Sequence, residues 1–316
     1  DPRLRQLFGR YATYCRSSPF LAPATLMLVA HVEQEGVWLV EGGMHRLATA
    51  LADLAAARGA ELRYGAEVEA ILVQSGRACG VRLAGGEQLA ADALVLNADV
   101  AALAAGRLGR AAAPAVAAPP PARRSLSAVT WTLVAQAKGF PLVRHNVFFS
   151  GDYAGEFEDI LRRARLPAAP TVYVCAQDRD DQGALAPAEE RLLCLVNAPA
   201  IGDRHAFPAA EIEPCARRTF AFLERCGLSL EHPPQACTVT TPADFEQLFP
   251  ATGGALYGQA SHGWKASFER PWARTRLPGL YLAGGSCHPG PGLPMAALSG
   301  RMAATCLLAD RASTRR

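Results

Sequence analysis

Lysine is nearly absent from this chain: Lys138 and Lys265 are the only two among 316 residues, and arginine supplies the rest of the basic charge. The arginines are scattered and the net charge is only +3, so the sequence offers no basic stripe and predicts no nucleic-acid partner. No apolar run approaches the ~18–20 residues that cross a bilayer, and no signal peptide is visible. Because half of the residues are hydrophobic, we expect a sizeable core. The dispersed cysteines favour a reducing compartment, so we expect a cytoplasmic location.

Cysteines at metal-ligand or redox spacing are missing as well. None of the nine cysteines forms a C-x-x-C pair, which predicts free thiols in a reducing compartment and no metal site. The signatures G-x-S-x-G, G-x-x-x-x-G-K-[ST] and G-x-G-x-x-G are also absent. Their absence argues against a serine hydrolase, a P-loop phosphotransferase and a complete dinucleotide site. The cysteines are Cys15, Cys79, Cys175, Cys194, Cys215, Cys226, Cys237, Cys287 and Cys306.

The most informative stretch runs from residue 277 to residue 304. Leu280–Ala283 reads as a short buried strand, Gly284 and Gly285 end it, and a loop of prolines and glycines follows. Pro294 suits the first turn of a helix. A strand, a side-chain-poor loop and a helix N-terminus bring backbone N–H groups and a partial positive charge to an anionic ligand. A plain corner with glycines for packing remains the alternative.

This stretch resembles the C-terminal flavin-binding segment of the phytoene-desaturase-like carotenoid desaturases. In that family Gly-Leu-Tyr-Leu-x-Gly, His-Pro-Gly and a Pro-initiated helix occur in the same order, as they do here from Gly279 onward. The family lies within the FAD-dependent amine-oxidase-like flavoproteins. Many of those carry an acidic residue just after the strand, where this sequence has Gly285-Ser286. Residues 7–19 and 31–38 look more narrowly like the bacterial 1-hydroxycarotenoid 3,4-desaturases, and the resemblance covers essentially the whole chain.

The resemblance implies a mixed α/β (α+β) fold of the amine-oxidase-like flavoprotein type. A Rossmann-like FAD domain, whose N-terminal half lies outside this sequence, would join an antiparallel-sheet substrate domain. Residues 1–37 would be substrate-domain helices, 38–105 an FAD-domain segment, 106–272 the substrate domain and 273–316 the C-terminal FAD-domain segment. We therefore expect this sequence to be the C-terminal part of a longer enzyme whose dinucleotide fingerprint precedes it.

Sequence periodicity predicts the main elements. Short strands are expected at 60–64, 68–73, 79–83 and 93–96 in the FAD segment, and at 127–136, 146–149, 171–175 and 191–196 in the substrate domain. An apolar helix is expected at 22–32, an amphipathic helix at 44–55 and another at 210–226. The first of these is core packing or, alternatively, a wall of a lipid tunnel or a membrane-facing surface.

The resemblance also implies which residues contact FAD. The start of the helix after Gly42-Gly43 would lie near the isoalloxazine, Val68 would pair with the adenine edge, and Asn97 would be a strand-end contact. From the residues alone, two glycines before a helix more often form a turn than a ligand site, and Val68 could equally be a valine of a core strand. The expected cofactor contacts are Gly42, Gly43, Val68, Asn97, Gly284, Gly285, Gly292, Pro294 and Met295.

The implied reaction is desaturation of an acyclic hydroxy or methoxy carotenoid. Removing hydride from one carbon and a proton from its neighbour needs a flavin, a dry apolar channel and few titratable groups. His288 is the catalytic candidate, although an imidazole tied to loop backbone is the alternative; Tyr257, His262 and Trp264 would line the substrate channel. The carotenoid is lipid-soluble, so peripheral membrane contact is expected, with oxygen or quinone as the electron acceptor.

Other functions stay open from the residues. Phytoene desaturase and an amine-oxidase-like flavoenzyme are the near alternatives. A non-catalytic member of the same fold could instead carry a lipid or bind a prenylated partner without flavin. An upstream G-x-G-x-x-G would favour the enzymes, because this motif holds the ADP half of FAD.

Overall fold

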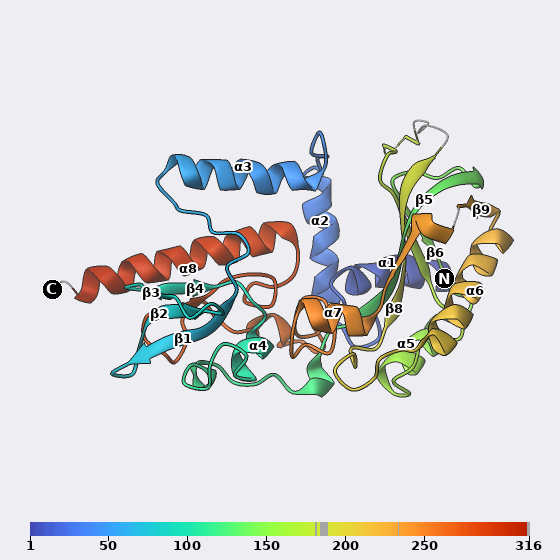
Figure 1. Ribbon diagram of the computed structural model, residues 1–316. Helices are drawn as coiled ribbons and strands as arrows, with labels where there is room; N and C mark the ends of the chain where they lie inside the picture. The colour runs from blue at the N-terminus through green and yellow to red at the C-terminus, as the bar shows by residue number, and fades with distance from the viewer. Residues whose placement is uncertain (181, 184–188, 233, 315–316) are drawn as a thin grey trace.

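A six-stranded antiparallel sheet forms one lobe of the computed structural model, which describes residues 1–180, 182–183, 189–232 and 234–314. The strand order is β10-β5-β8-β7-β6, with β9 paired to the far end of the long, curved β5 (Figure 1). The strands are β5 (Ser127–Gly139), β6 (His145–Phe148), β7 (Val172–Ala176), β8 (Glu190–Ala198), β9 (Leu228–Glu231) and β10 (Cys237–Thr240).

One face of this sheet carries the main core. Alternate residues of β5, namely Val129, Trp131 and Leu133, are almost fully buried, because successive side chains of a strand point to opposite faces. Helix α6 (Ala209–Arg225) packs there, and the Trp131 and Phe220 rings meet edge-on at 5.7 Å. On the opposite face Thr132 and Val134 are exposed, and α5 (Tyr153–Leu161) closes one end of the lobe.

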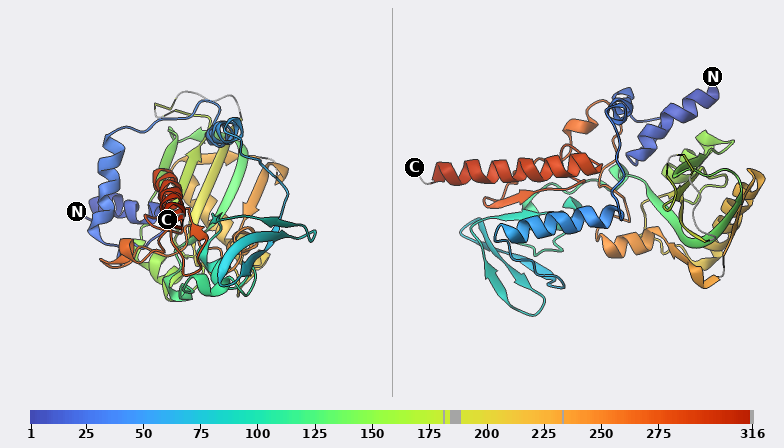
Figure 2. Two further views of the ribbon diagram at one scale, coloured as in Figure 1. Left: turned by 90° about the vertical axis from the view of Figure 1, so that its left-hand side faces the viewer. Right: turned by 90° about the horizontal axis from the view of Figure 1, so that it is seen from above.

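The second lobe combines two small sheets with helices. Strands β1 (Val68–Gln74), β2 (Arg77–Leu83) and β3 (Gln88–Ala90) form an antiparallel sheet, while β4 (Leu94–Leu96) and β11 (Leu280–Leu282) pair in parallel. Helices α3 (Met44–Ala57) and α8 (Leu293–Thr314) run in the same direction on this lobe, with their N-terminal ends at the junction with the large sheet (Figures 1 and 2). Short α4 (Val100–Ala104) follows β4.

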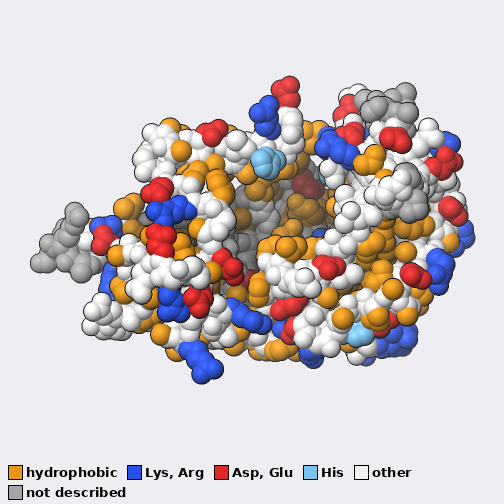
Figure 3. Space-filling view, viewed as in Figure 1, with side chains coloured by type: hydrophobic (Ala, Val, Ile, Leu, Met, Phe, Trp, Pro, Cys, Tyr) orange, Lys and Arg blue, Asp and Glu red, His pale blue; other side chains and the backbone are white. Residues whose placement is uncertain are grey.

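The remaining helices lie at the junction between the lobes. Helix α1 (Pro2–Tyr14) begins beside the large sheet and ends near the junction; α2 (Leu28–Gln34) follows a 3₁₀ turn (Ala24–Met27), and α7 (Pro242–Leu248) lies on the other side. The predicted apolar helix at 22–32 is thus two shorter pieces. A hollow opens between the lobes, and hydrophobic side chains are visible in part of its wall (Figure 3).

The strand predicted at 60–64 is wrong. These residues form no strand, and Leu62 and Tyr64 are exposed. A strand exists only when its backbone groups pair with a neighbour, and the described part of the chain supplies none here. Helix α3 forms as predicted, yet none of its residues is buried, and Met44, Leu51 and Leu54 are exposed on it.

The structure shows all nine cysteines as free thiols. Within residues 1–180, 182–183, 189–232 and 234–314, no group of three His, Cys, Asp or Glu side chains could hold a metal ion. In the same ranges, no helix combines the length and apolar character needed to cross a bilayer.

Candidate active site

Two predicted cofactor contacts meet where the parallel strands end. Because β4 and β11 are parallel, their carboxyl ends share one edge, and Asn97 and Gly284 follow them directly. A Cβ added to Gly284 would lie 2.4 Å from Asn97 Oδ1. The Gly284 N–H donates to Ser299 Oγ of α8 at 3.1 Å. Strand, loop and helix are therefore tied together at this point.

The loop from Gly284 to Gly292 has little side-chain bulk and a backbone that suits glycine. Gly284, Gly290 and Gly292 have φ of 115°, 132° and 112°, values that side-chain-bearing residues rarely adopt. Space beside Gly292 is open, since an added Cβ would meet nothing within 4 Å. Helix α8 starts at Leu293, so Pro294 is in its first turn as predicted, with Met295 half-buried behind it.

Gly42 and Gly43 lie at the start of the neighbouring helix. Both have positive φ, 76° and 87°, and Gly43 is the N-cap of α3. The N-terminal ends of α3 and α8 both face the junction (Figures 1 and 2), so two positive helix ends point toward the same region. Val68 is the first residue of β1, half-buried and paired with Leu83. It belongs to the three-stranded sheet, apart from the loop cluster.

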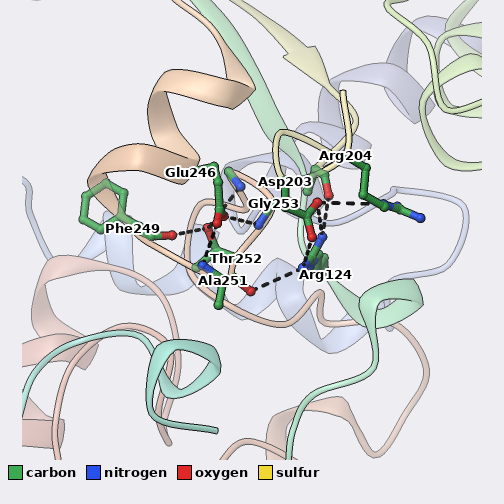
Figure 4. Close-up of polar contacts among 10 residues, drawn as sticks. Arg124, Asp203, Arg204, Glu246, Phe249, Ala251, Thr252 and Gly253 are labelled. Atoms are coloured by element: carbon green, nitrogen blue, oxygen red, sulfur yellow. Dashed lines mark hydrogen bonds and ion pairs between the residues drawn. The ribbon is translucent and has the colours of Figure 1, made fainter. Parts of the chain in front are cut away.

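A turn from the large-sheet lobe reaches this loop, and ion pairs fix its base. The Arg124 guanidinium binds the Asp203 carboxylate through two hydrogen bonds of 2.9 and 2.8 Å. Glu246 accepts from the N–H groups of Ala251 and Gly253 at 2.7 and 2.6 Å (Figure 4). An added Cβ on Gly253 would collide with the Arg124 guanidinium at 2.2 Å, so this position needs glycine.

Farther along this turn, Tyr257 lies next to the loop after β11. Backbone bonds from Leu256 to Leu126 and from Ser125 to Gly258 hold it along the start of β5. The Tyr257 ring comes within 3.7 Å of a Cβ added to Gly285. Tyr257 itself has φ of 81°, a strained value for a bulky residue. Its predicted place beside the site is therefore compatible with the structure.

Arg270 was not among the predicted site residues, yet it holds the cluster together. It is 2% exposed, and its guanidinium donates to the carbonyls of Tyr257 at 2.9 Å, Gly285 at 3.2 Å and Gln259 at 2.5 Å. Burial lowers the pKa of Arg270. Its five donors in a rigid fork suit a bridge between separate backbone segments. No local sequence pattern announces such a role.

The predicted histidines are both tied into the surrounding structure. The His288 imidazole stacks on the Trp272 ring with centroids 4.0 Å apart. The backbone N–H of His288 donates to the Pro271 carbonyl at 2.8 Å. His262 Nε2 accepts from the Ser18 N–H at 3.0 Å, and burial lowers its pKa. Trp264 is 77% exposed, outside the buried part of the cluster. The catalytic and substrate-lining roles stay predictions.

Two further ionisable groups adjoin the loop. Asp99 caps α4 by accepting from the Ala101 N–H at 2.8 Å, and burial raises the pKa of its carboxyl. Cys287 is fully buried, and burial raises the pKa of its thiol to about 11. A thiol that stays protonated is a poor nucleophile. Cys287 is therefore not an activated nucleophile.

The residues present fit the isoalloxazine end of a flavin. Open space lies next to Gly43 and Gly292, where an added Cβ would meet nothing within 4 Å. The N-terminal N–H groups of α3 and α8 lack helical carbonyl partners, so they can donate to the anionic or carbonyl edge of the ring. Ser286 and backbone groups would have to serve where many flavoproteins of this type carry an acidic residue.

Comparisons with known proteins agree with this reading. Residues 4–137 match the model of the family described as flavin containing amine oxidoreductase. The hydroxyneurosporene desaturase of Rubrivivax gelatinosus is 62% identical over 316 residues, which are 100% of this chain and 60% of that protein. The hydroxyneurosporene desaturase of Cereibacter sphaeroides is 51% identical, again over 100% of this chain and 63% of its own length. The predicted resemblance to carotenoid desaturases is confirmed.

The chain thus spans about three fifths of the length of these relatives. Among solved structures, an oxidoreductase from Methanosarcina mazei superposes with a TM-score of 0.51 at 18% identity, over 82% of this chain and 53% of that one. At this identity the likeness shows the fold alone. The predicted fold, mixed α/β with an antiparallel sheet, is confirmed, and residues 4–137 resemble the flavin containing amine oxidoreductases.

Proposed function

We propose that this chain serves the FAD-dependent desaturation of an acyclic hydroxy or methoxy carotenoid in carotenoid biosynthesis. The observation that carries the proposal is the 62% identity, over every residue of the chain, to a hydroxyneurosporene desaturase. The glycine-rich loop at the ends of β4 and β11 supports it, because this loop is where a flavin of this fold would be held. The predicted division into two FAD-domain segments and two substrate-domain segments is part of the same proposal.

In this proposal FAD supplies the hydride acceptor, and the protein supplies binding, orientation and exclusion of water. Gly42, Gly43, Asn97 and the loop from Gly284 to Met295 would hold the ring end of the cofactor, and Val68 would meet the adenine end. Tyr257 would press the carotenoid chain toward that ring. The hydrophobic side chains in part of the wall of the hollow in Figure 3 suit a long hydrocarbon. His288 or water would take the proton.

The surroundings of the enzyme are also proposed. A carotenoid partitions into lipid, and several large apolar side chains lie exposed on and after α1 and α2, among them Phe8, Phe20, Leu28 and Trp38. Exposed apolar patches of this kind mark interaction surfaces. We propose a bacterial cytoplasmic protein in peripheral contact with the membrane, with oxygen or quinone as the electron acceptor. Alkaline carbonate should release it from membranes, and retention in the pellet would contradict this.

Single-turnover reduction tests the proposed activity. The full-length, flavin-loaded protein is mixed anaerobically with an acyclic 1-hydroxycarotenoid, and the bleaching of oxidised flavin is followed together with the extended polyene absorption of the product. Stoichiometric appearance of both signals supports the proposal. Flavin that stays oxidised while an amine reduces it would point to an amine oxidase. A protein that binds carotenoid and contains no flavin would point to a lipid carrier.

A further inference from the structure

Arg270 is a buried cation whose hydrogen-bond acceptors are all uncharged. The residue is 2% exposed, and its guanidinium donates to the backbone carbonyls of Tyr257, Gln259 and Gly285. In the part of the chain that the structure describes, Arg270 forms no ion pair with a carboxylate. A guanidinium stays protonated in proteins, and burying a charge without a counter-ion is costly. Bridging three carbonyls requires donors but no net charge, so the bridging role leaves the charge itself unexplained.

The loop that we assign to the flavin contacts this guanidinium at two points. The Gly285 carbonyl accepts from it at 3.2 Å, and a Cβ added to Gly290 would lie 3.2 Å from Arg270 Nε. Directly after Arg270, the Pro271 carbonyl accepts from the backbone N–H of His288 at 2.8 Å. These contacts fix the positive charge against the backbone of the proposed flavin loop.

Asp99 places a charge of the opposite sign near the same loop. Its Oδ1 caps α4. A Cβ added to Gly258 would lie 3.4 Å from Asp99 Oδ2 and 2.8 Å from the Cβ of Ser286, so the free carboxylate oxygen is close to the loop. Arg270 and Asp99 are therefore two separate charges beside the loop, each of which can be removed by itself.

We infer that the charge of Arg270 stabilises the negative charge that hydride transfer places on the flavin, and so raises the reduction potential of the bound cofactor. The inference rests on the proposed function through its FAD site. Desaturation of a C–C bond transfers a hydride, which is two electrons with one proton, to the flavin, and releases a second proton to His288 or water. A hydride added to a neutral ring leaves one negative charge there, and charges near the ring tune its electronics.

A fixed cation suits this reaction. The N-terminal ends of α3 and α8 supply only partial charges of about half a unit each, whereas the guanidinium supplies a full one. Its three hydrogen bonds hold it in place, so the charge acts without reorganisation when the ring becomes anionic. Hydride removal from a hydrocarbon has no heteroatom on the reacting carbons to assist it, and a higher potential of the acceptor favours the step.

The test measures the midpoint potential of the bound flavin in the full-length protein, by anaerobic reductive titration beside a dye of known potential. No carotenoid is needed. Arg270→Gln keeps an amide donor and removes the charge. It should weaken the binding of reduced FAD relative to oxidised FAD about 10- to 100-fold, which lowers the potential by about 30–60 mV for a two-electron couple. Arg270→Lys, which keeps the charge, should retain most of the wild-type potential.

Asp99→Asn is the second variant, with an effect of the opposite sign. Asparagine also caps helices, so α4 should form, and loss of the negative charge beside the loop should raise the potential. The measurement is made near pH 8, where the Asp99 carboxyl is ionised although burial raises its pKa. Arg274→Gln is the matched control. Arg274 is exposed and paired with Asp310 at 2.9 Å, so solvent screens its charge and the potential should not change.

Three results would overturn the role of the Arg270 charge. The first is a wild-type potential in flavin-loaded Arg270→Gln. The second is a potential in Arg270→Lys as low as in Arg270→Gln, which would make the geometry of the guanidinium responsible. If Arg270→Gln retains no flavin, an unchanged or lowered potential in Asp99→Asn is the third. A wild-type protein that holds flavin and oxidises no carotenoid would instead reject the proposed activity, while the potentials would still decide the role of Arg270.

Discussion

Asn97 and Gly284 lie so close that no side chain fits between them: a Cβ on Gly284 would stand 2.4 Å from Asn97 Oδ1. The contact joins the ends of two strands that are almost 190 residues apart in sequence and parallel in space. It also fixes the first residue of the loop that we assign to the flavin. Packing at this one residue therefore decides whether the loop can form.

Gly284→Ala should lose flavin and stability together. The substitution adds the collision with Asn97 to the strain of φ 115°, and we expect a loss of about 2–4 kcal/mol in the free energy of unfolding. Gly86→Ala is the control, because Gly86 has φ of 86° and open space around its added Cβ, so only strain of about 1 kcal/mol remains. Urea unfolding and flavin absorbance measure both variants; equal losses would contradict the collision.

Arg270→Met should loosen the junction between the lobes. Methionine has similar length but no donors, so three partly buried carbonyls lose their partner, at a cost of about 2–4 kcal/mol in unfolding free energy. Flavin should dissociate more readily, since the Tyr257 turn and the Gly285 loop lose their common anchor. Arg301→Met, at an exposed position on α8, is the control. Flavin retention equal to wild type in Arg270→Met would show that the anchor is dispensable.

Local signals made much of the fold predictable. The strand at 127–136 appears as β5 (Ser127–Gly139), and the helix at 210–226 as α6 (Ala209–Arg225). The loop after β11 was recognisable because glycine and proline report backbone conformation directly. The strand at 60–64 failed because its apolar pattern says nothing about whether a pairing partner is present. Arg270 was missed because its hydrogen-bond partners come from other segments of the chain.

Stability should fall on the acid side of neutrality through His262. Burial lowers the pKa of His262 below its usual value near 6.5, so the unfolded chain binds a proton more readily than the folded one. The contribution of neutral His262 to the free energy of unfolding is complete above pH 6.5. It is lost as the pH falls from the pKa of His262 in the unfolded chain toward its lower pKa in the folded protein. We expect His262→Gln to flatten the decline in unfolding free energy between neutral and mildly acidic pH. His31→Gln, at an exposed position on α2, should keep the wild-type profile, and an unaltered decline in His262→Gln would assign it elsewhere.

Pro294→Asp should reduce flavin content without unfolding the protein. The residue is exposed in the first turn of α8, where a carboxylate is compatible with the helix itself. The carboxylate would, however, compete with an anionic flavin edge for the partial positive charge at the helix N-terminus. Pro294→Ala removes the ring without adding charge and should retain flavin. Flavin titration of the apoprotein compares the two affinities. If the aspartate variant binds as tightly as the alanine variant, the helix end does not face the cofactor.

The last prediction separates a brace from a base at His288. Its imidazole stacks on Trp272 with centroids 4.0 Å apart, which favours a bracing role. A base is also not required, since a polyene cation beside the flavin is acidic enough for water to take its proton. His288→Phe keeps a flat ring and removes the proton acceptor, so we expect full flavin content and a single-turnover reduction rate within about 10-fold of wild type. General acid–base catalysis is worth ~10²–10⁴-fold; a loss of that size at full flavin content would make His288 the base. If stacking on Trp272 is what holds the loop, Trp272→Ala and His288→Ala should both lose flavin.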